Sequence, residues 1–211
     1  MKYYTYVSDA KLDMLYAQVP KRILDRIAVE LQIDLKVVKF ALKERPTEQN
    51  RYDRLAIVTA YVERDMEVGS IDEPMQWFRG TAPIVQARAG GREEAVVLFA
   101  SDMPRTVLGL TGSLRHVIGD VSGSVFSGSS TAGAVDANSA LRSLDRTQPI
   151  EDGRAVDALR GLVERTTRKY EGTELPSEFL AQRLAYQPRS RGTSQAFLLG
   201  TPLYVARGEN A

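Results

Sequence analysis

The stretch from Met75 to Gly119 most constrains the fold, because its hydrophobic pattern has the two-residue period of β-strands. Residues of different polarity alternate from Trp77 to Arg88, and Gly90-Gly91 between two β-rich runs is a hairpin signal. A second turn at Ser101–Pro104 leads into a third run, Thr106–Leu110. We therefore predict an antiparallel three-stranded meander at the centre of the fold.

Two further strands are expected near the ends of the chain. Tyr3–Ser8 is rich in aromatic and β-branched residues, which favour strands. Gln195–Ala206 is a buried-strand pattern interrupted at Gly200-Thr201-Pro202, which we interpret as a bulge or kink. We expect these two strands to be neighbours, in one antiparallel sheet of about five strands.

Helical periodicity dominates the remaining chain. Apolar residues recur on one face within Ile23–Leu31, Tyr52–Met66 and Ala155–Tyr170, and we assign a further helix to Pro176–Pro188. Together with the strands, these patterns predict an α+β fold whose antiparallel sheet is flanked by amphipathic helices. The segment Gly119–Gly133 is rich in Gly and Ser, so we predict a flexible loop there.

Composition limits the class of protein. A chain of 211 residues with 43% hydrophobic content is long enough for one well-buried core, so a single domain over residues 1–211 is expected. A net charge of +1 gives no overall field that attracts nucleic acid or a membrane. The chain has no cysteine, no secretion signal and no long apolar run, which favours a cytoplasmic protein.

Four segments resemble an uncharacterised family of actinobacterial (Streptomyces-type) proteins of about this length. They are the opening YYTYVSDAKLDML, the motif WFRG, the stretch LGLTGSLRHVIG and the segment LLGTPLYVA near the end. The resemblance spans the chain and implies a bacterial protein that shares the fold of that family. It transfers no activity, and it therefore assigns no catalytic or binding residue.

His116 is the only histidine and thus the only side chain with an ordinary pKa near neutrality. It follows Ser113 by three residues, directly after a predicted strand, and a Ser-His pair at this spacing could serve nucleophilic catalysis. The structural alternative is that Ser113 caps a helical turn and that His116 is satisfied by hydrogen bonds.

Aromatic and arginine residues suggest a ligand-binding surface on the sheet. Trp77 and Arg79 begin the meander, and Arg88 and Arg115 lie further along it. Arginines on one strand face could bind a carboxylate or phosphate through paired hydrogen bonds, although an ordinary solvated face has the same pattern. Trp77 could equally be a core residue.

The interrupted last strand suggests a second part of this pocket. A break in a strand frees backbone N–H and C=O groups at the end of a sheet. If the first and last strands pair, Thr201 and Tyr204 could line a pocket together with Tyr6 and Ser8.

Other kinds of site have little support. A lone histidine without cysteine makes a zinc site improbable, and no carboxylate pair follows a predicted strand, so we predict no metal and no cofactor. Basic residues such as Arg183, Arg189 and Arg191 are balanced by nearby acids, which disfavours nucleic acid binding.

Three functions are left open by these patterns. The first is a non-catalytic protein that binds or senses a small molecule, with a pocket near Trp77, Arg79, His116 and Tyr204. The second is an enzyme for a small metabolite, using Ser113 and His116 as nucleophile and general base. The third is a helix-mediated interaction protein, which could form a homodimer.

Overall fold

The computed structural model describes residues 2–35, 48–89, 96–120, 150, 152–190 and 194–208. The chain divides into two compact units, one made of Met1–Ser8 with Gly69–Ala211 and the other of Asp9–Val68. The prediction of a single domain stays a prediction. The predicted turn at Gly90-Gly91 and residues 121–133 of the predicted loop lie outside the described residues.

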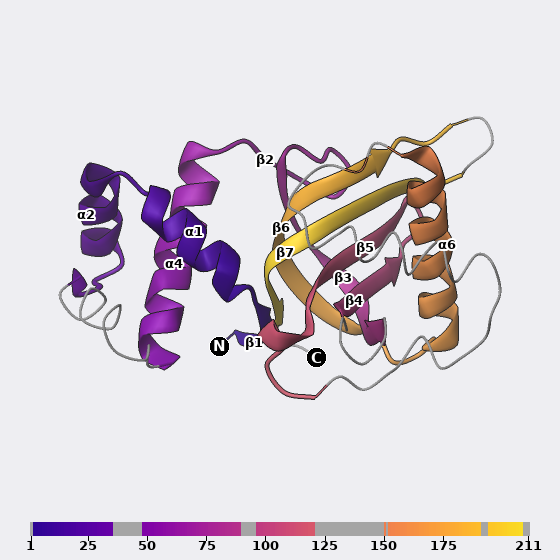
Figure 1. Ribbon diagram of the computed structural model, residues 1–211, viewed down its shortest axis with the longest axis horizontal. Helices are drawn as coiled ribbons and strands as arrows, with labels where there is room; N and C mark the ends of the chain where they lie inside the picture. The colour runs from indigo at the N-terminus through magenta and orange to yellow at the C-terminus, as the bar shows by residue number, and fades with distance from the viewer. Residues whose placement is uncertain are drawn as a thin grey trace. The chain divides into compact units, whose positions relative to one another are not determined.

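Within the described ranges the larger unit is built on a sheet of seven strands (Figure 1). The strands are β1 (Tyr3–Val7), β2 (Val68–Gly69), β3 (Trp77–Ala89), β4 (Val96–Asp102), β5 (Thr106–Ser113), β6 (Leu175–Gln187) and β7 (Ala196–Arg207). Five of them form a closed barrel, because β6 pairs with both β3 and β7 and so joins the ends of the series β3-β4-β5-β7.

The pairing confirms the predicted α+β class and the antiparallel meander of β3, β4 and β5. The terminal strands are neighbours as predicted, since β1 lies antiparallel to β7 with Tyr3 opposite Arg207. The prediction of a flanked antiparallel sheet was imprecise in two respects. The sheet closes into a barrel, and β5 and β7 form a parallel pair.

The predicted helix from Pro176 to Pro188 is wrong, because this segment forms β6. Phe179, Leu180 and Leu184 fit a helical stripe, but the segment is hydrogen-bonded along both edges, to β3 and to β7. Pairing between distant segments therefore outweighs the local period. A register shift next to Leu184 also breaks the alternation by which a strand would be recognised.

The barrel interior is an aromatic core. One buried cluster draws residues from all five barrel strands and from β1, and its largest members are Tyr6, Phe78, Phe99 and Phe179. Phe78 and Phe179 pack edge to face with ring centroids 5.7 Å apart, and Tyr6 and Phe99 do so at 5.6 Å. On β3 these interior positions are Phe78, Ala82 and Ile84, which alternate with exposed Arg79 and Thr81.

The outer face of the barrel packs against helix α6 (Gly153–Lys169). A second buried cluster joins Leu159, Leu162 and Val163 of α6 to outward residues such as Leu98 and Val107. The helix begins at Asp152, whose carboxylate accepts a hydrogen bond from the Arg154 N–H at 3.0 Å.

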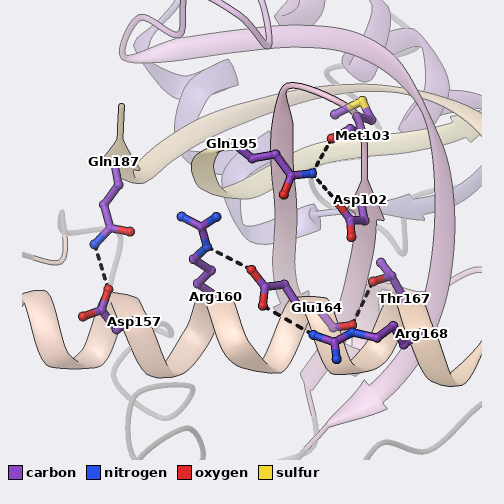
Figure 2. Close-up of polar contacts among 9 residues, drawn as sticks. All are labelled: Asp102, Met103, Asp157, Arg160, Glu164, Thr167, Arg168, Gln187 and Gln195. Carbon is purple, nitrogen blue, oxygen red and sulfur yellow. Dashed lines mark hydrogen bonds and ion pairs between the residues drawn. The ribbon is translucent and has the colours of Figure 1, made fainter. Parts of the chain in front are cut away.

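Polar contacts along α6 complete its attachment (Figure 2). The Gln187 amide at the end of β6 donates to Asp157 at 3.1 Å, which links the strand to the helix. Within α6, Glu164 pairs with Arg160 at 2.9 Å and with Arg168 at 3.7 Å. Part of the basic character of this helix is therefore balanced on its own surface.

The smaller unit contains α1 (Asp9–Gln18), α2 (Lys21–Glu30) and α4 (Glu48–Asp65). Leu24 and Ile27 of α2 pack with Ile57 of α4 in an apolar cluster, as the helical periodicity predicts. Arg54 of α4 pairs with Asp13 of α1, and its guanidinium lies 5.2 Å from the centre of the Tyr16 ring. None of the helices in the described ranges is long and apolar enough to cross a membrane.

Candidate ligand-binding site

A cavity of about 130 Å³ lies in the larger unit at one end of the barrel. It is lined by one residue from β1, residues from β3, β4, β6 and β7, and two residues from the turn that follows α6. These residues are Thr5, Ile84, Gln86, Phe99, Tyr170, Thr173, Leu175, Ser177, Val205 and Arg207. The cavity is therefore assembled from segments that are distant in the sequence.

The apolar wall of the cavity continues the barrel core. Ile84, Phe99 and Val205 belong to the interior cluster, and Leu175 lies opposite Ile84 where β6 begins. Since alternate residues of a strand share a face, Gln86 points to the same interior side as Ile84. Gln86 thus places an amide beside this apolar wall.

Three of the lining hydroxyl groups are already used as donors. Thr5 donates to the Val205 carbonyl at 3.3 Å, Ser177 to the Leu175 carbonyl at 3.0 Å, and Thr173 to the Tyr170 carbonyl at 2.7 Å. Each oxygen keeps lone pairs that can accept a hydrogen bond. These groups help to hold the cavity in shape, and they present acceptors rather than donors to it.

Two lining groups have donors to spare. The Gln86 Nε2 atom is buried and has no hydrogen-bond partner among the described residues. Arg207, at the end of β7, is exposed and forms no ion pair or hydrogen bond with another side chain in the part of the chain that the structure describes. Among the described residues of the lining, it is also the only charged one. The site therefore combines a buried amide donor with a cation near solvent.

The structure separates the predicted ligand residues of β3. Trp77 is buried and Arg79 exposed on the outer face, opposite to the side of Phe78. Arg88 follows Gln86 by two residues along β3, so it lies on the same interior side of the strand, but it does not line the cavity. Arg79 and Arg88 thus lie on opposite faces, about 30 Å apart along the strand. They do not form one binding surface.

Ser113 is the last residue of β5, and Arg115 and His116 lie in the short turn that follows it. Ser113 caps the 3₁₀ helix Leu114–His116, and its hydroxyl accepts from the Arg115 N–H at 3.4 Å and from Arg115 Nε at 3.5 Å. The His116 ring lies edge to face against Tyr6 with centroids 6.1 Å apart. None of the three residues lines the cavity. Their predicted roles in catalysis or binding stay predictions.

Thr201 and Tyr204 lie on β7 and face away from the barrel interior, since Gly200 and Val205 beside them face Phe78 and the interior cluster. Tyr204 donates to Glu178 at 3.2 Å and packs edge to face against Tyr4 at 5.6 Å. The predicted pairing of first and last strands is confirmed. It brings Thr5 of β1 to the cavity, whereas Thr201 and Tyr204 do not line it.

Sequence reasoning missed Gln86 and Arg207 as site residues. Gln86 could have been found, because it is a polar residue on the apolar face of a predicted strand, between Ile84 and Arg88. Ser177 could not, since it lies within the predicted helix Pro176–Pro188. The described residues contain no group of three His, Asp or Glu side chains placed to bind a metal, and the prediction of no metal site stays a prediction.

Comparison with known proteins identifies the family. Residues 2–209 match a family of unknown function, DUF7019. The chain belongs to the DUF7019 family. The match covers every motif on which the predicted resemblance depends, so membership of an uncharacterised family is confirmed, while the actinobacterial origin stays a prediction. No curated protein and no solved structure matches the chain.

Proposed function

We propose that this DUF7019 protein is a non-catalytic protein that binds or senses a small molecule, and that the barrel-end cavity is its ligand site. The supporting observation is the buried Gln86 Nε2 atom, which has no described partner and belongs to a residue that lines the cavity. An unsatisfied buried donor costs about 1–3 kcal/mol of stability. A ligand that accepts this hydrogen bond would offset that cost.

The outer surface of the barrel offers less to a ligand. Five-stranded barrels of the OB type bind oligonucleotides and oligosaccharides on the outer face of their second and third strands. The first strand of this barrel is β3, so its second and third strands are β4 and β5. Helix α6 covers residues of both, including Leu98 and Val107. This packing favours binding at the barrel end and disfavours nucleic acid as the partner.

The enzyme hypothesis receives less support. A nucleophilic serine needs a hydroxyl directed to its base, whereas the Ser113 hydroxyl accepts two contacts from Arg115. The hypothesis of a helix-mediated interaction protein has no supporting contact within the described residues.

A fragment screen followed by two-dimensional NMR tests the proposal. We expect bound fragments to shift the amide signals of residues that line the cavity, among them Thr5, Gln86 and Ser177. The variant Val205→Phe adds bulk to a lining position and should abolish this binding. The matched control is Val29→Phe, at an exposed position of α2, which should leave binding unchanged.

Fragments that bind Val205→Phe as tightly as the unsubstituted protein would contradict the proposal, provided that circular dichroism shows both proteins to be folded. If Val205→Phe does not fold, Gln86→Leu replaces it, because leucine has nearly the volume of glutamine and removes the donor. Binding that Gln86→Leu leaves unchanged would equally count against the proposal.

A further inference from the structure

We infer that the ligand of the barrel-end cavity is a small organic carboxylate, whose charged oxygens are bound by Arg207 and Gln86 while its carbon body packs against the apolar wall. This inference rests on the proposed function and adds the chemical class of the ligand. It depends on three properties of the lining, which are charge, the balance of donors and acceptors, and size.

The charge of the lining favours an anion. Arg207 is cationic, and none of the described residues that line the cavity is a carboxylate that could neutralise it. The adjacent acid, Glu174, accepts a hydrogen bond from the Gly172 N–H at 2.8 Å on the turn between α6 and β6. Arg88 adds a second cation on the interior side of β3, one alternate position beyond Gln86. A positively charged ligand would be repelled here.

The free donors favour oxygen acceptors on the ligand. The hydroxyl groups of Thr5, Thr173 and Ser177 donate to carbonyl groups of the backbone, whereas the Gln86 amide and the Arg207 guanidinium keep donors for a ligand. A guanidinium presents paired N–H groups that match the two oxygens of a carboxylate. The amide could then donate to one of these oxygens or to a second oxygen of the ligand.

The size and the apolar wall favour an organic anion over an inorganic one. The cavity of about 130 Å³ is smaller than the sites of drug-sized ligands, which occupy about 300–1,000 Å³. Ile84, Phe99, Leu175 and Val205 would leave part of a phosphate or sulfate ion without partners. A short-chain or single-ring carboxylate satisfies both the donors and the wall.

Titration calorimetry with matched probes tests the class of ligand. The probes are acetate, butyrate and benzoate, with benzamide and benzylamine as neutral and cationic partners of benzoate, and inorganic phosphate as the inorganic anion. We expect butyrate or benzoate to bind at least tenfold more tightly than benzamide, benzylamine and phosphate.

Two variants test which lining residues bind the carboxylate group of the ligand. Arg207→Gln should weaken carboxylate binding about tenfold and leave any benzamide binding unchanged, because only the charge-assisted hydrogen bonds are lost. The matched control is Arg105→Gln, which removes the same charge from the exposed turn between β4 and β5 and should change affinity less than twofold. Gln86→Leu should weaken carboxylates and benzamide alike.

The outcomes separate the inference from the proposed function. Binding of benzamide or benzylamine that equals benzoate and is lost in Gln86→Leu would overturn the carboxylate class and leave the cavity as the ligand site. Phosphate binding that equals benzoate and is lost in Arg207→Gln would overturn the organic class. Failure of every probe and of the fragment screen would overturn both.

Discussion

Substitution of Gln86 should change the stability of the protein and its ligand binding in opposite directions. Its amide nitrogen is buried without a partner, so Gln86→Leu removes an unsatisfied donor and adds apolar contact. We expect the free energy of unfolding to rise by about 1 kcal/mol, measured by urea denaturation. Gln187→Leu is the control, since it removes an exposed contact with Asp157 and should change stability by less than about 0.5 kcal/mol.

A loss of stability in Gln86→Leu would mean that the amide makes a favourable contact in the folded protein, and Gln86 would then be a structural residue. A gain in stability together with lost ligand binding is the pattern of a residue kept for function at the expense of stability.

Gly200 is a residue at which the interior core has no room for a side chain. A Cβ atom added there would lie 2.7 Å from the Phe78 ring and 3.0 Å from the Gln182 carbonyl oxygen. Because Phe78 is fully buried and cannot move aside, we expect Gly200→Ala to lower the free energy of unfolding by about 1–3 kcal/mol. Thermal and urea denaturation would measure the change.

Gly153→Ala is the matched control for that variant. Gly153 opens α6 with no atom close to an added Cβ, and alanine favours helices, so this change should raise stability by about 0.5 kcal/mol. Equal effects of the two substitutions would show that the close approach to Phe78 has no energetic consequence.

At the scale of elements, the contact between α1 and α4 should make stability depend on pH. Burial raises the pKa of the Tyr16 hydroxyl, and the positive charge of Arg54 lowers it by a smaller amount. The unfolded chain then loses this proton first, at about pH 10. The free energy of unfolding should therefore fall as the pH rises from about 10 through the folded pKa.

Tyr16→Phe removes the titrating group, so its stability should fall less steeply above about pH 10 than that of the unsubstituted protein. Tyr3→Phe, at a position that is 62% exposed, should follow the unsubstituted curve. Urea denaturation at several pH values supplies the comparison. Parallel curves for Tyr16→Phe and the unsubstituted protein would contradict a raised pKa.

Most elements could be predicted from the sequence because the hydrophobic pattern of each one is regular within its own segment. The meander and the helices α2, α4 and α6 carry regular alternation or regular helical stripes. β6 could not be predicted, because its register shifts disrupt the two-residue period and Leu180 and Leu184 imitate a helix. The residue pattern within the β6 segment does not reveal its hydrogen bonds to the distant strands β3 and β7.

At the scale of the whole molecule, that one misassigned element concealed both the barrel and the site. Without β6, the strands from β3 to β7 form an open sheet, and nothing joins its ends. The cavity shares this dependence, since Leu175 and Ser177 of β6 supply part of its lining. The predicted residues clustered on motifs such as WFRG, whereas the cavity takes one or two residues from each of five strands.

The position of β7 in the barrel has a consequence for how the protein is made. β7 pairs with β1, β5 and β6, so the wall cannot close before a ribosome has translated residue 207. Thr5 is bonded to Val205, 200 residues later, which at about 20 residues per second is a wait of about 10 s. During that interval the nascent chain exposes unpaired strand edges and its aromatic core residues. Its yield in the cell should therefore depend on chaperones that bind the chain before its release.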